Sequence, residues 1–389
     1  MLNLNKWPYY EEDEIRAASN VLNSGKVNYW TGNENINFER EFSEYCGVKY
    51  AIAMANGSLA LSGCYASLEL EKDSEIITTP RTFIATASTA VILGYRIIFA
   101  DVDINSGCIT AETILPKITK KTRAISVVHL GGWPARMQEI CDLAKAYNLF
   151  VIEDCSQAHG AKIDHKSVGS FGDVSSWSFC QEKIISTGGE GGMITTNNKQ
   201  IYDYIWSYKD HGKNYLKVFS KNKDTGFRWL HDSFGTNMRL TEFQSSIGRI
   251  QLSKLENWNK LRARNANILY DFLKNISCVR IPEVTENIRH AWYKYYVYIN
   301  FDHLSDDWDR SKILNELKKQ GAPAFTGSCG EIYLEKSFQT IDNYQNKRLK
   351  NARNLAETSL MFLIHHTITE EQMYSYAGLI KKVLKQASI

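Results

Sequence analysis

Two residues that could do chemistry together, Asp154 and Lys183, lie in the stretch from Val151 to Met193. Asp154 comes just after the apolar run from Leu149 to Ile152, which is typical of a buried strand. In an open parallel sheet, ligands bind at the carboxyl ends of the strands, which is where this carboxylate would lie. Taken alone, however, an Asp after a strand more often caps the next turn or helix.

Lys183 gains significance from what surrounds it. Taken alone it would be an ordinary solvated lysine, but it precedes a glycine-rich segment in which backbone can approach a ligand closely, with glycines at 188, 189, 191 and 192. A lysine amine that forms a Schiff base is productive only beside an electron sink. Pyridoxal 5′-phosphate (PLP) is such a sink, and it works best with an anion on its pyridinium nitrogen. Asp154 could be that anion.

A third segment, AMANGSLALSGCYASL, could bind the phosphate of such a cofactor. Gly57 and Ser58 form a turn at the start of a helical pattern, so their backbone N–H groups would point at an anion and gain from the helix dipole. A simple helix cap is the commoner use of such a turn. The order and spacing of the three segments, rather than any one of them, indicate a PLP site.

Short apolar runs must position these residues. Four of them are strand-like and separated by segments of crossover length, namely 75–79, 97–102, 125–130 and 149–152. Between the last two, Ile140, Leu143, Ala144 and Tyr147 follow a helical spacing and predict a crossover helix that packs on the sheet. The pattern predicts an α/β fold with a mostly parallel sheet flanked by helices.

The pattern changes after about Gln251. A long amphipathic helix is expected there, with Leu269, Phe272, Leu273 and Ile276 on its apolar face. The strand-like YKYYVYIN, a helix over 308–320 and a terminal helix from Thr369 follow. We therefore expect a large domain over 1–251, including the N-terminal arm, and a smaller C-terminal α+β domain over 252–389.

Composition argues against several other classes of protein. The 46 Lys and Arg nearly balance the 43 Asp and Glu, so the chain lacks the basic character of a nucleic-acid binder. The N-terminal residues have no apolar core typical of a signal or anchor, and no window is long and apolar enough for a membrane span. The eight cysteines are dispersed without a CxxC pair, so we expect reduced thiols, no metal site and a cytoplasmic location.

Over nearly its full length the chain resembles the DegT/DnrJ/EryC1/StrS family of PLP-dependent sugar aminotransferases, a branch of the fold-type I aminotransferases. The resemblance is carried by NGSLAL, TPRTFIATAS, VVHLGGWPARM, EDCSQAHGA, SFCQEKIISTGGEGG, FGTNMRLTEFQSSIGRIQL and HAWYKYYV. It implies a fold-type I architecture, PLP as cofactor and a transaminase that converts a keto sugar.

The resemblance also implies a role for each residue of the cofactor site. Lys183 would hold PLP as a Schiff base, Asp154 would pair with the pyridine nitrogen, and Gln157 would contact the ring hydroxyl. The remaining cofactor-binding residues are Ser178 and the Gly57–Ser58 turn at the phosphate, and Phe83 stacked on the ring.

Asn237 matches the family position that reaches the phosphate of the neighbouring subunit's cofactor. The resemblance therefore implies a homodimer with shared active sites, in which assembly and activity are coupled.

Two histidines are not assigned to the cofactor site. His159 lies either near the cofactor or in a structural hydrogen bond, with structure slightly favoured, and His129 is expected to be satisfied within the sheet.

Two segments depart from the simplest family members. The stretch 213–233 is longer, and its Lys217, Lys221, Arg228 and Trp229 could meet a sugar phosphate or carboxylate, although such a loop is more often solvated. The stretch 324–333, with TPRTFIA and WSFCQEK, resembles the subgroup containing the aminotransferase that makes 8-amino-3,8-dideoxyoctulosonate, a sugar acid of lipopolysaccharide.

The resemblance implies a two-stage transamination with L-glutamate as amino donor. The expected acceptor is a nucleotide-linked 4-keto-6-deoxyhexose, giving a 4-amino-4,6-dideoxy sugar for a bacterial cell-surface glycan such as O-antigen or lipopolysaccharide. Formation of 8-amino-3,8-dideoxyoctulosonate is the first alternative. A PLP-dependent sugar dehydratase is another, but such relatives carry a histidine where this chain has Lys183. A non-catalytic scaffold would show degraded motifs, and a Rossmann dehydrogenase would need a GxGxxG motif, which GSLALSG does not supply.

Overall fold

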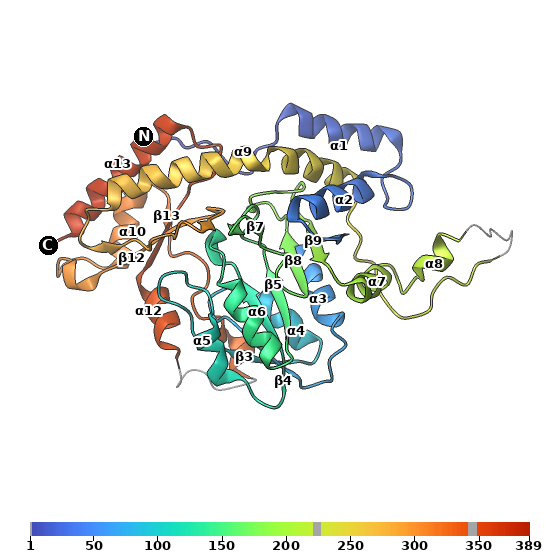
Figure 1. The fold of residues 1–389 in the computed structure, drawn as a ribbon. Coiled ribbons are helices and arrows are strands. Elements are labelled where there is room, and N and C mark those ends of the chain that lie inside the picture. The colour runs from blue at the N-terminus through green and yellow to red at the C-terminus, as the bar shows by residue number, and fades with distance from the viewer. Residues whose placement is uncertain (1, 221–226, 341–347) are drawn as a thin grey trace.

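A seven-stranded sheet forms the centre of the larger part of the molecule (Figure 1). The computed structural model describes residues 2–220, 227–340 and 348–389. The strands are β1 (Tyr50–Met54), β2 (Glu75–Thr78), β3 (Arg96–Phe99), β4 (Thr122–Val128), β5 (Phe150–Asp154), β8 (Val174–Ser178) and β9 (Gly192–Thr196), in the order β1-β9-β8-β5-β4-β2-β3. In this sheet β9 alone runs opposite to the other strands. The predicted mostly parallel α/β fold is therefore confirmed.

The four predicted strands are β2, β3, β4 and β5, with shifted ends. Burial on both faces explains their continuous apolar runs, since every residue of β2 is buried. The strand predicted over 97–102 is β3, which ends at Phe99 rather than Val102. It ends there because the Asp101 side chain accepts a hydrogen bond from the Val102 N–H and turns the chain. Asp154, expected just beyond its strand, is the last residue of β5.

Helices flank this sheet on both sides (Figure 1). The helical elements of this part of the chain are α1 (Glu12–Ser24), α2 (Glu34–Cys46), α3 (Gly57–Ala66), α4 (Ala85–Ile92), α5 (Ala111–Ile114), α6 (Met137–Ala146), α7 (Lys199–Tyr208) and α8 (Tyr215–Val218), with short 3₁₀ turns η1 (Leu115–Lys117) and η2 (Leu130–Gly132). Of these, α1 lies against α9 (Glu242–Leu273), and α8 lies away from the sheet (Figure 1). The predicted crossover helix is α6. It buries Ile140 and Ala144, but Tyr147 lies at its C-cap and is exposed, so the apolar face is shorter than predicted.

The long helix α9 (Glu242–Leu273) begins nine residues before the position at which the sequence analysis places the domain boundary, and residue 251 lies inside it. Its Thr241 and Gln244 form a capping box that fixes the start. Figure 1 shows α9 along one side of the molecule, with α1 and α2 against its first half and α13 against its second. Leu269 and Leu273 are buried as expected, whereas Ile276 is buried beyond the end of the helix.

The C-terminal part combines a four-stranded antiparallel sheet with helices. Its strands are β10 (Val279–Arg280), β12 (Tyr295–Ile299), β13 (Ala324–Phe325) and β14 (Ser359–Phe362), in the order β10-β12-β14-β13. Its helical elements are η3 (Phe301–His303), α10 (Arg310–Lys319), η4 (Ile332–Leu334), α11 (Lys336–Gln339), α12 (Lys350–Thr358) and α13 (Glu370–Ala387). Leu2 and Leu4 from the N-terminal arm pack on the core of this part.

A small sheet of β6 (Lys162–Ile163), β7 (Lys166–Ser167) and β11 (Ile288–Arg289), in the order β11-β6-β7, joins the two parts of the chain. None of the helices in the described ranges combines the length and the apolar character needed to cross a membrane.

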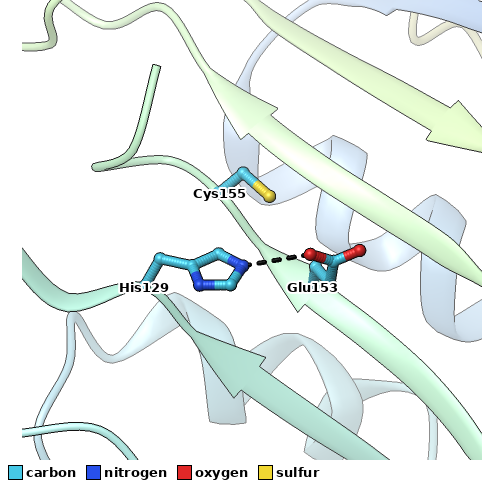
Figure 2. Close-up of side chains that lie close together, drawn as sticks. All are labelled: His129, Glu153 and Cys155. Carbon is cyan, nitrogen blue, oxygen red and sulfur yellow. Dashed lines mark hydrogen bonds and ion pairs between the residues drawn. The ribbon is translucent and has the colours of Figure 1, made fainter. Parts of the chain in front are cut away.

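A buried polar pair links β4 to β5, as Figure 2 shows. The His129 Nε2 atom lies 3.1 Å from Glu153 Oε2, and His129 Nδ1 accepts a hydrogen bond from the Ala135 N–H. That acceptor role leaves the ring proton on Nε2, which therefore donates to Glu153. The Glu153 carboxylate also accepts from the backbone N–H groups of Gly169, Phe171 and Gly172. As expected, His129 is satisfied within the sheet.

The Cys155 sulfur lies close to this pair, and ligand atoms of the three residues fall within 4.8 Å of one another (Figure 2). Such a group can hold a metal ion when its lone pairs are free. Here the lone pair of His129 Nδ1 and both oxygens of Glu153 already accept hydrogen bonds from the protein. We therefore interpret the cluster as structural.

The pair of His129 and Glu153 makes the free energy of unfolding depend on pH. Burial raises the pKa of Glu153, but the hydrogen bond from His129 and the backbone N–H groups of Gly172 and Gly169 outweigh it and hold the pKa below its ordinary value. A depressed carboxyl pKa stabilises the fold above the ordinary pKa, and this contribution is lost as pH falls through the folded-state pKa. Glu153→Gln should lower the free energy of unfolding by about 1–3 kcal/mol at pH 7.

Denaturant unfolding at several pH values would measure the difference between wild type and Glu153→Gln. It should shrink as the solution is acidified, because the wild-type carboxylate then becomes neutral too. The exposed Glu44→Gln is the control, with an expected change within about 0.5 kcal/mol. A difference that stays constant down to acidic pH would contradict the role given to the Glu153 charge.

Candidate active site

Asp154 ends β5 with its carboxylate buried. Its Oδ2 atom accepts a hydrogen bond of 2.8 Å from the Thr86 hydroxyl, and Oδ1 accepts one of 3.1 Å from the Ser156 N–H. The second contact is the turn-capping role considered from the sequence, so Asp154 fills that role as well. In the part of the chain that the structure describes, no Lys, Arg or His forms an ion pair with this carboxylate.

A buried carboxylate without a cationic partner is costly, so it calls for one in the working protein. The protonated pyridine nitrogen of PLP is such a partner, and it would complete the hydrogen bonds of Asp154. Thr86 holds the carboxylate from α4, which sequence reasoning missed, although the residue lies in the TFIAT motif. The residues at this position therefore fit the cofactor.

Gln157 and His159 follow Asp154 on the same turn of chain, and both are buried. The Gln157 Oε1 atom accepts a hydrogen bond of 2.8 Å from the Gly131 N–H, which fixes the amide of Gln157 beside β4. His159 packs against Trp177 and Phe179, with ring centroids 5.4 and 5.6 Å away. Neither ring nitrogen of His159 has a hydrogen-bond partner among the described residues.

The His159 ring is neutral at physiological pH. Burial lowers the pKa of His159 to about 3, and the positive charges of Lys183 and Arg262 contribute. Both roles considered for His159 from the sequence, beside the cofactor or structural, stay predictions.

Lys183 lies in the loop between β8 and β9 and is half-buried. Its backbone N–H donates to Cys180 O at 3.0 Å, and its carbonyl accepts from the Trp7 indole at 2.8 Å, so both sides of the residue are anchored. The ammonium lies 5.2 Å from the centroid of the Tyr293 ring. Among the described residues it forms no ion pair with a carboxylate, which leaves the amine available for chemistry.

A second amine, Lys294, lies near Lys183, at 5.0 Å from the centroid of the same Tyr293 ring. Burial lowers the pKa of Lys294 to about 8, and the charges of Arg262 and Lys183 lower it further against the opposing effect of Glu182. Cationic groups gathered in this way favour an anionic ligand. Sequence reasoning missed Tyr293 and Lys294, whose only signal is their place in the HAWYKYYV motif.

The predicted phosphate site is assembled from two elements. Gly57 is the first residue of α3, whose N-cap is Asn56, and it packs directly on Ser178 at the end of β8. A Cβ atom on Gly57 would lie 2.6 Å from the Ser178 Cβ, so this approach requires glycine. Ser58 is exposed at the start of the same helix. Helix N–H groups beside a serine hydroxyl are well suited to a phosphate.

Gly57→Ala should therefore weaken PLP binding by about 10-fold or more, because the added methyl group would push the start of α3 away from Ser178. Equilibrium titration of the cofactor-free protein with PLP measures this directly. Gly378→Ala is the matched control, since it is also helical and its nearest atom would be 3.8 Å away. Unchanged PLP affinity in Gly57→Ala would contradict the phosphate site.

Phe83 and Asn237 are not brought against the other predicted residues within one chain. The Phe83 side chain is 65% exposed and precedes α4. Asn237 is exposed, forms an isolated bridge with Asp210 and accepts a hydrogen bond of 3.2 Å from the Arg239 N–H. Ring stacking by Phe83 and contact of Asn237 with a neighbouring subunit's cofactor stay predictions.

Helix α8, which belongs to the long stretch 213–233, lies away from the central sheet (Figure 1). Lys217 pairs with Asp232, and Arg228 donates to Lys217 O, so the loop's own atoms engage both cations. Trp229 is 82% exposed, and Lys221 lies outside the described residues. A substrate role for this loop stays a prediction.

Comparison with known proteins identifies the type of site. The chain is 36% identical to GDP-perosamine synthase of Escherichia coli O157:H7 over 290 residues, which are 74% of this chain and 76% of that protein. The X-ray structure of an aminotransferase from Psychrobacter cryohalolentis superposes with a TM-score of 0.96 at 45% identity, covering 99% of this chain and 100% of the other.

An E. coli GDP-4-keto-6-deoxy-D-mannose-3-dehydratase solved with bound hydrated PLP has the same fold, with a TM-score of 0.87 at 25% identity over 99% of this chain and 100% of that one. Residues 8–380 match the DegT/DnrJ/EryC1/StrS aminotransferase family. The predicted fold-type I architecture and the predicted cofactor are thereby confirmed. The chain belongs to the DegT/DnrJ/EryC1/StrS aminotransferase family and is a PLP-dependent aminotransferase.

Proposed function

We propose that this enzyme transfers an amino group from L-glutamate to a nucleotide-linked 4-keto-6-deoxyhexose, giving a 4-amino-4,6-dideoxy sugar. The product would enter a bacterial cell-surface glycan. The proposal is supported by relatives such as GDP-perosamine synthase, whose name denotes a nucleotide-linked amino sugar. It also includes a cytoplasmic homodimer with shared sites, in which Asn237 reaches the neighbouring subunit, and a division of the chain at residue 251.

The single observation that carries the chemistry is the buried Asp154 carboxylate, hydrogen-bonded by Thr86 but without a cation among the described residues. PLP, when bound, supplies the electron sink that makes proton removal from the carbon bearing the amine feasible. Asp154 keeps the pyridine nitrogen protonated. Its burial strengthens this interaction, because electrostatic effects are larger away from water.

Lys183 has two tasks in this mechanism. Its amine would hold the cofactor covalently, and when free it would remove and return a proton at the substrate carbon that bears the amine. The anchored backbone of Lys183 restricts where the amine can reach.

There are two alternatives to this proposal, a different reaction and a different amino acceptor. The sugar-dehydratase alternative is disfavoured by Lys183, since a histidine is expected at that position in such relatives. The alternative acceptor, which leads to 8-amino-3,8-dideoxyoctulosonate, is favoured by one observation. The TPRTFIA segment meets the segment 324–333 through a hydrogen bond of 2.9 Å from the Ile332 N–H to Pro80 O, so the two stretches that carry that resemblance are adjacent.

The experiment that tests the acceptor uses enzyme converted to its amino form with L-glutamate and freed of excess donor. Nucleotide-linked 4-keto-6-deoxyhexoses on dTDP, UDP and GDP, and the 8-keto form of 3-deoxyoctulosonate, are then added separately. We expect one nucleotide sugar to regenerate the visible absorbance of PLP and to yield an amino sugar detectable by mass spectrometry. Regeneration only by the octulosonate would replace the proposed acceptor with the alternative, and regeneration by none would reject both.

A further inference from the structure

Arg81 is a buried cation without a partner. It follows β2 in the TPRTFIA motif, and its side chain is completely shielded from solvent. None of its three guanidinium nitrogens, Nε, Nη1 and Nη2, has a hydrogen-bond acceptor among the described residues. Buried arginines are normally paired with carboxylates or carbonyls, because a guanidinium stays protonated wherever it lies.

Two aromatic rings account for only part of its surroundings. The guanidinium carbon lies 5.5 Å from the centroid of the Tyr296 ring and 5.7 Å from that of the Tyr298 ring. Such contacts favour a cation, but they do not accept the in-plane N–H groups of the guanidinium. The five N–H donors of Arg81 are therefore free for a planar acceptor, and a carboxylate is the acceptor that fits the fork best.

The residue after Arg81, Thr82, is connected to the Asp154 carboxylate by a short chain of hydrogen bonds. The neighbouring Thr82 hydroxyl lies 2.9 Å from that of Thr86, which in turn donates to Asp154 at 2.8 Å. The predicted ring-stacking residue, Phe83, follows two positions after Arg81. An anion bound at Arg81 would therefore lie on the same wall of the active site as the cofactor.

The segment 324–333 covers Arg81 from the C-terminal part of the chain. Its Ser328 N–H donates to the Tyr296 hydroxyl at 3.1 Å, which places the segment over one of the two rings. Burial raises the pKa of the Cys329 thiol, and the positive charge of Arg81 opposes that shift, so the guanidinium lies near this exposed cysteine. Glu331, the acid of the segment, is already held by Arg348.

A second cation, Arg310, has its pKa lowered by burial, while Glu357 opposes this shift and the charge of Arg81 adds to it. Tyr296 and Tyr298 also line a cavity of about 340 Å³ whose wall includes Lys294. The cavity and the Arg81 guanidinium thus share the rings of Tyr296 and Tyr298 as neighbours.

We propose that Arg81 binds the carboxylate of a substrate through its guanidinium fork and so determines which acids the enzyme accepts. This inference rests on the proposed transaminase function. The carboxylate comes either from a sugar acid as amino acceptor or from the glutamate and 2-oxoglutarate pair as donor and product.

The test compares binding to PLP-loaded wild type, Arg81→Met and Arg81→Lys by isothermal calorimetry. Three probes that do not react with this form are used: 3-deoxy-D-manno-octulosonate, its uncharged methyl ester, and 2-oxoglutarate. The control is Arg136→Met, which removes an exposed guanidinium. The visible spectrum and melting temperature of each variant establish that it is folded and loaded.

We expect wild type to bind at least one of the two acids, and Arg81→Met to bind it about 10- to 100-fold more weakly, because a charged hydrogen-bonded pair is lost. Arg81→Lys should recover part of the loss. The acid affected identifies the source: octulosonate indicates a sugar-acid acceptor, and 2-oxoglutarate indicates the donor. The methyl ester should bind weakly to every variant.

The proposal is overturned if folded Arg81→Met binds both acids as tightly as wild type does, or if wild type binds neither acid. It is also overturned if wild type binds the octulosonate and its methyl ester equally and does not bind 2-oxoglutarate. If Arg81→Met does not fold, Arg81→Lys and the acid-against-ester comparison on wild type decide the question. Failure of the transaminase function would be recognised separately, because the visible absorbance of PLP-loaded wild type would then not change when L-glutamate is added.

Discussion

Lys183→Ala should lose transaminase activity by about 10⁴-fold or more while keeping its fold. The amine of Lys183 both holds the cofactor and transfers the proton, and positioned proton transfer alone contributes about 10²- to 10⁴-fold. Since the Lys183 side chain forms no ion pair within the described ranges, its removal should cost little stability. Steady-state rates with L-glutamate and the identified acceptor, together with melting curves, measure both effects.

The matched control for this variant is Lys145→Ala on α6, which removes an exposed ammonium. Its rate should equal that of wild type. A small primary amine added to Lys183→Ala should restore part of the proton transfer, because the missing group is an amine. Activity of Lys183→Ala within 10-fold of wild type would contradict the assignment.

Asp154→Asn should lose about 10²- to 10⁴-fold in both half reactions, the range reported for groups that stabilise charge or move protons at a reacting centre. An asparagine can keep the hydrogen bonds from Thr86 and Ser156, so the local fold should survive. It cannot carry the negative charge that keeps the pyridine nitrogen protonated. Stopped-flow rates with L-glutamate and with the keto acceptor test each direction separately.

The control for Asp154→Asn is Asp142→Asn, an exposed carboxylate on α6 that accepts a hydrogen bond from Gln138. It should leave both half reactions unchanged. Near-normal rates of Asp154→Asn in both directions would refute the role of Asp154, and a loss in one direction only would show that its charge is not needed throughout.

Four strands of the central sheet, β2 to β5, could be predicted from the sequence because they form continuous apolar runs, whereas β1, β8 and β9 were not predicted. Runs such as 75–79 and 149–152 are typical of buried strands, and the structure has strands there with slightly shifted ends. Helix ends were harder. The start of α9 depends on the Thr241 capping box, and the burial of Ile276 beyond its end depends on the core of the C-terminal part.

The candidate site shows the same division. Asp154 and Lys183 could be found because strand ends and glycine-rich loops mark them in the sequence. Thr86, Lys294 and Arg81 could not, because their significance comes from neighbours far along the chain: the Asp154 carboxylate, the Tyr293 ring and the Tyr296 ring. Whether a guanidinium is buried without an acceptor is a property of tertiary packing, which residue spacing does not encode.

The most direct test of the transaminase function is the absorbance spectrum of the purified wild-type protein with PLP, recorded before and after L-glutamate is added. We predict a visible band that disappears with L-glutamate as the amino group is transferred, accompanied by one equivalent of 2-oxoglutarate per site. A protein that binds no PLP, or whose band is unchanged by L-glutamate and other amino donors, would contradict the account.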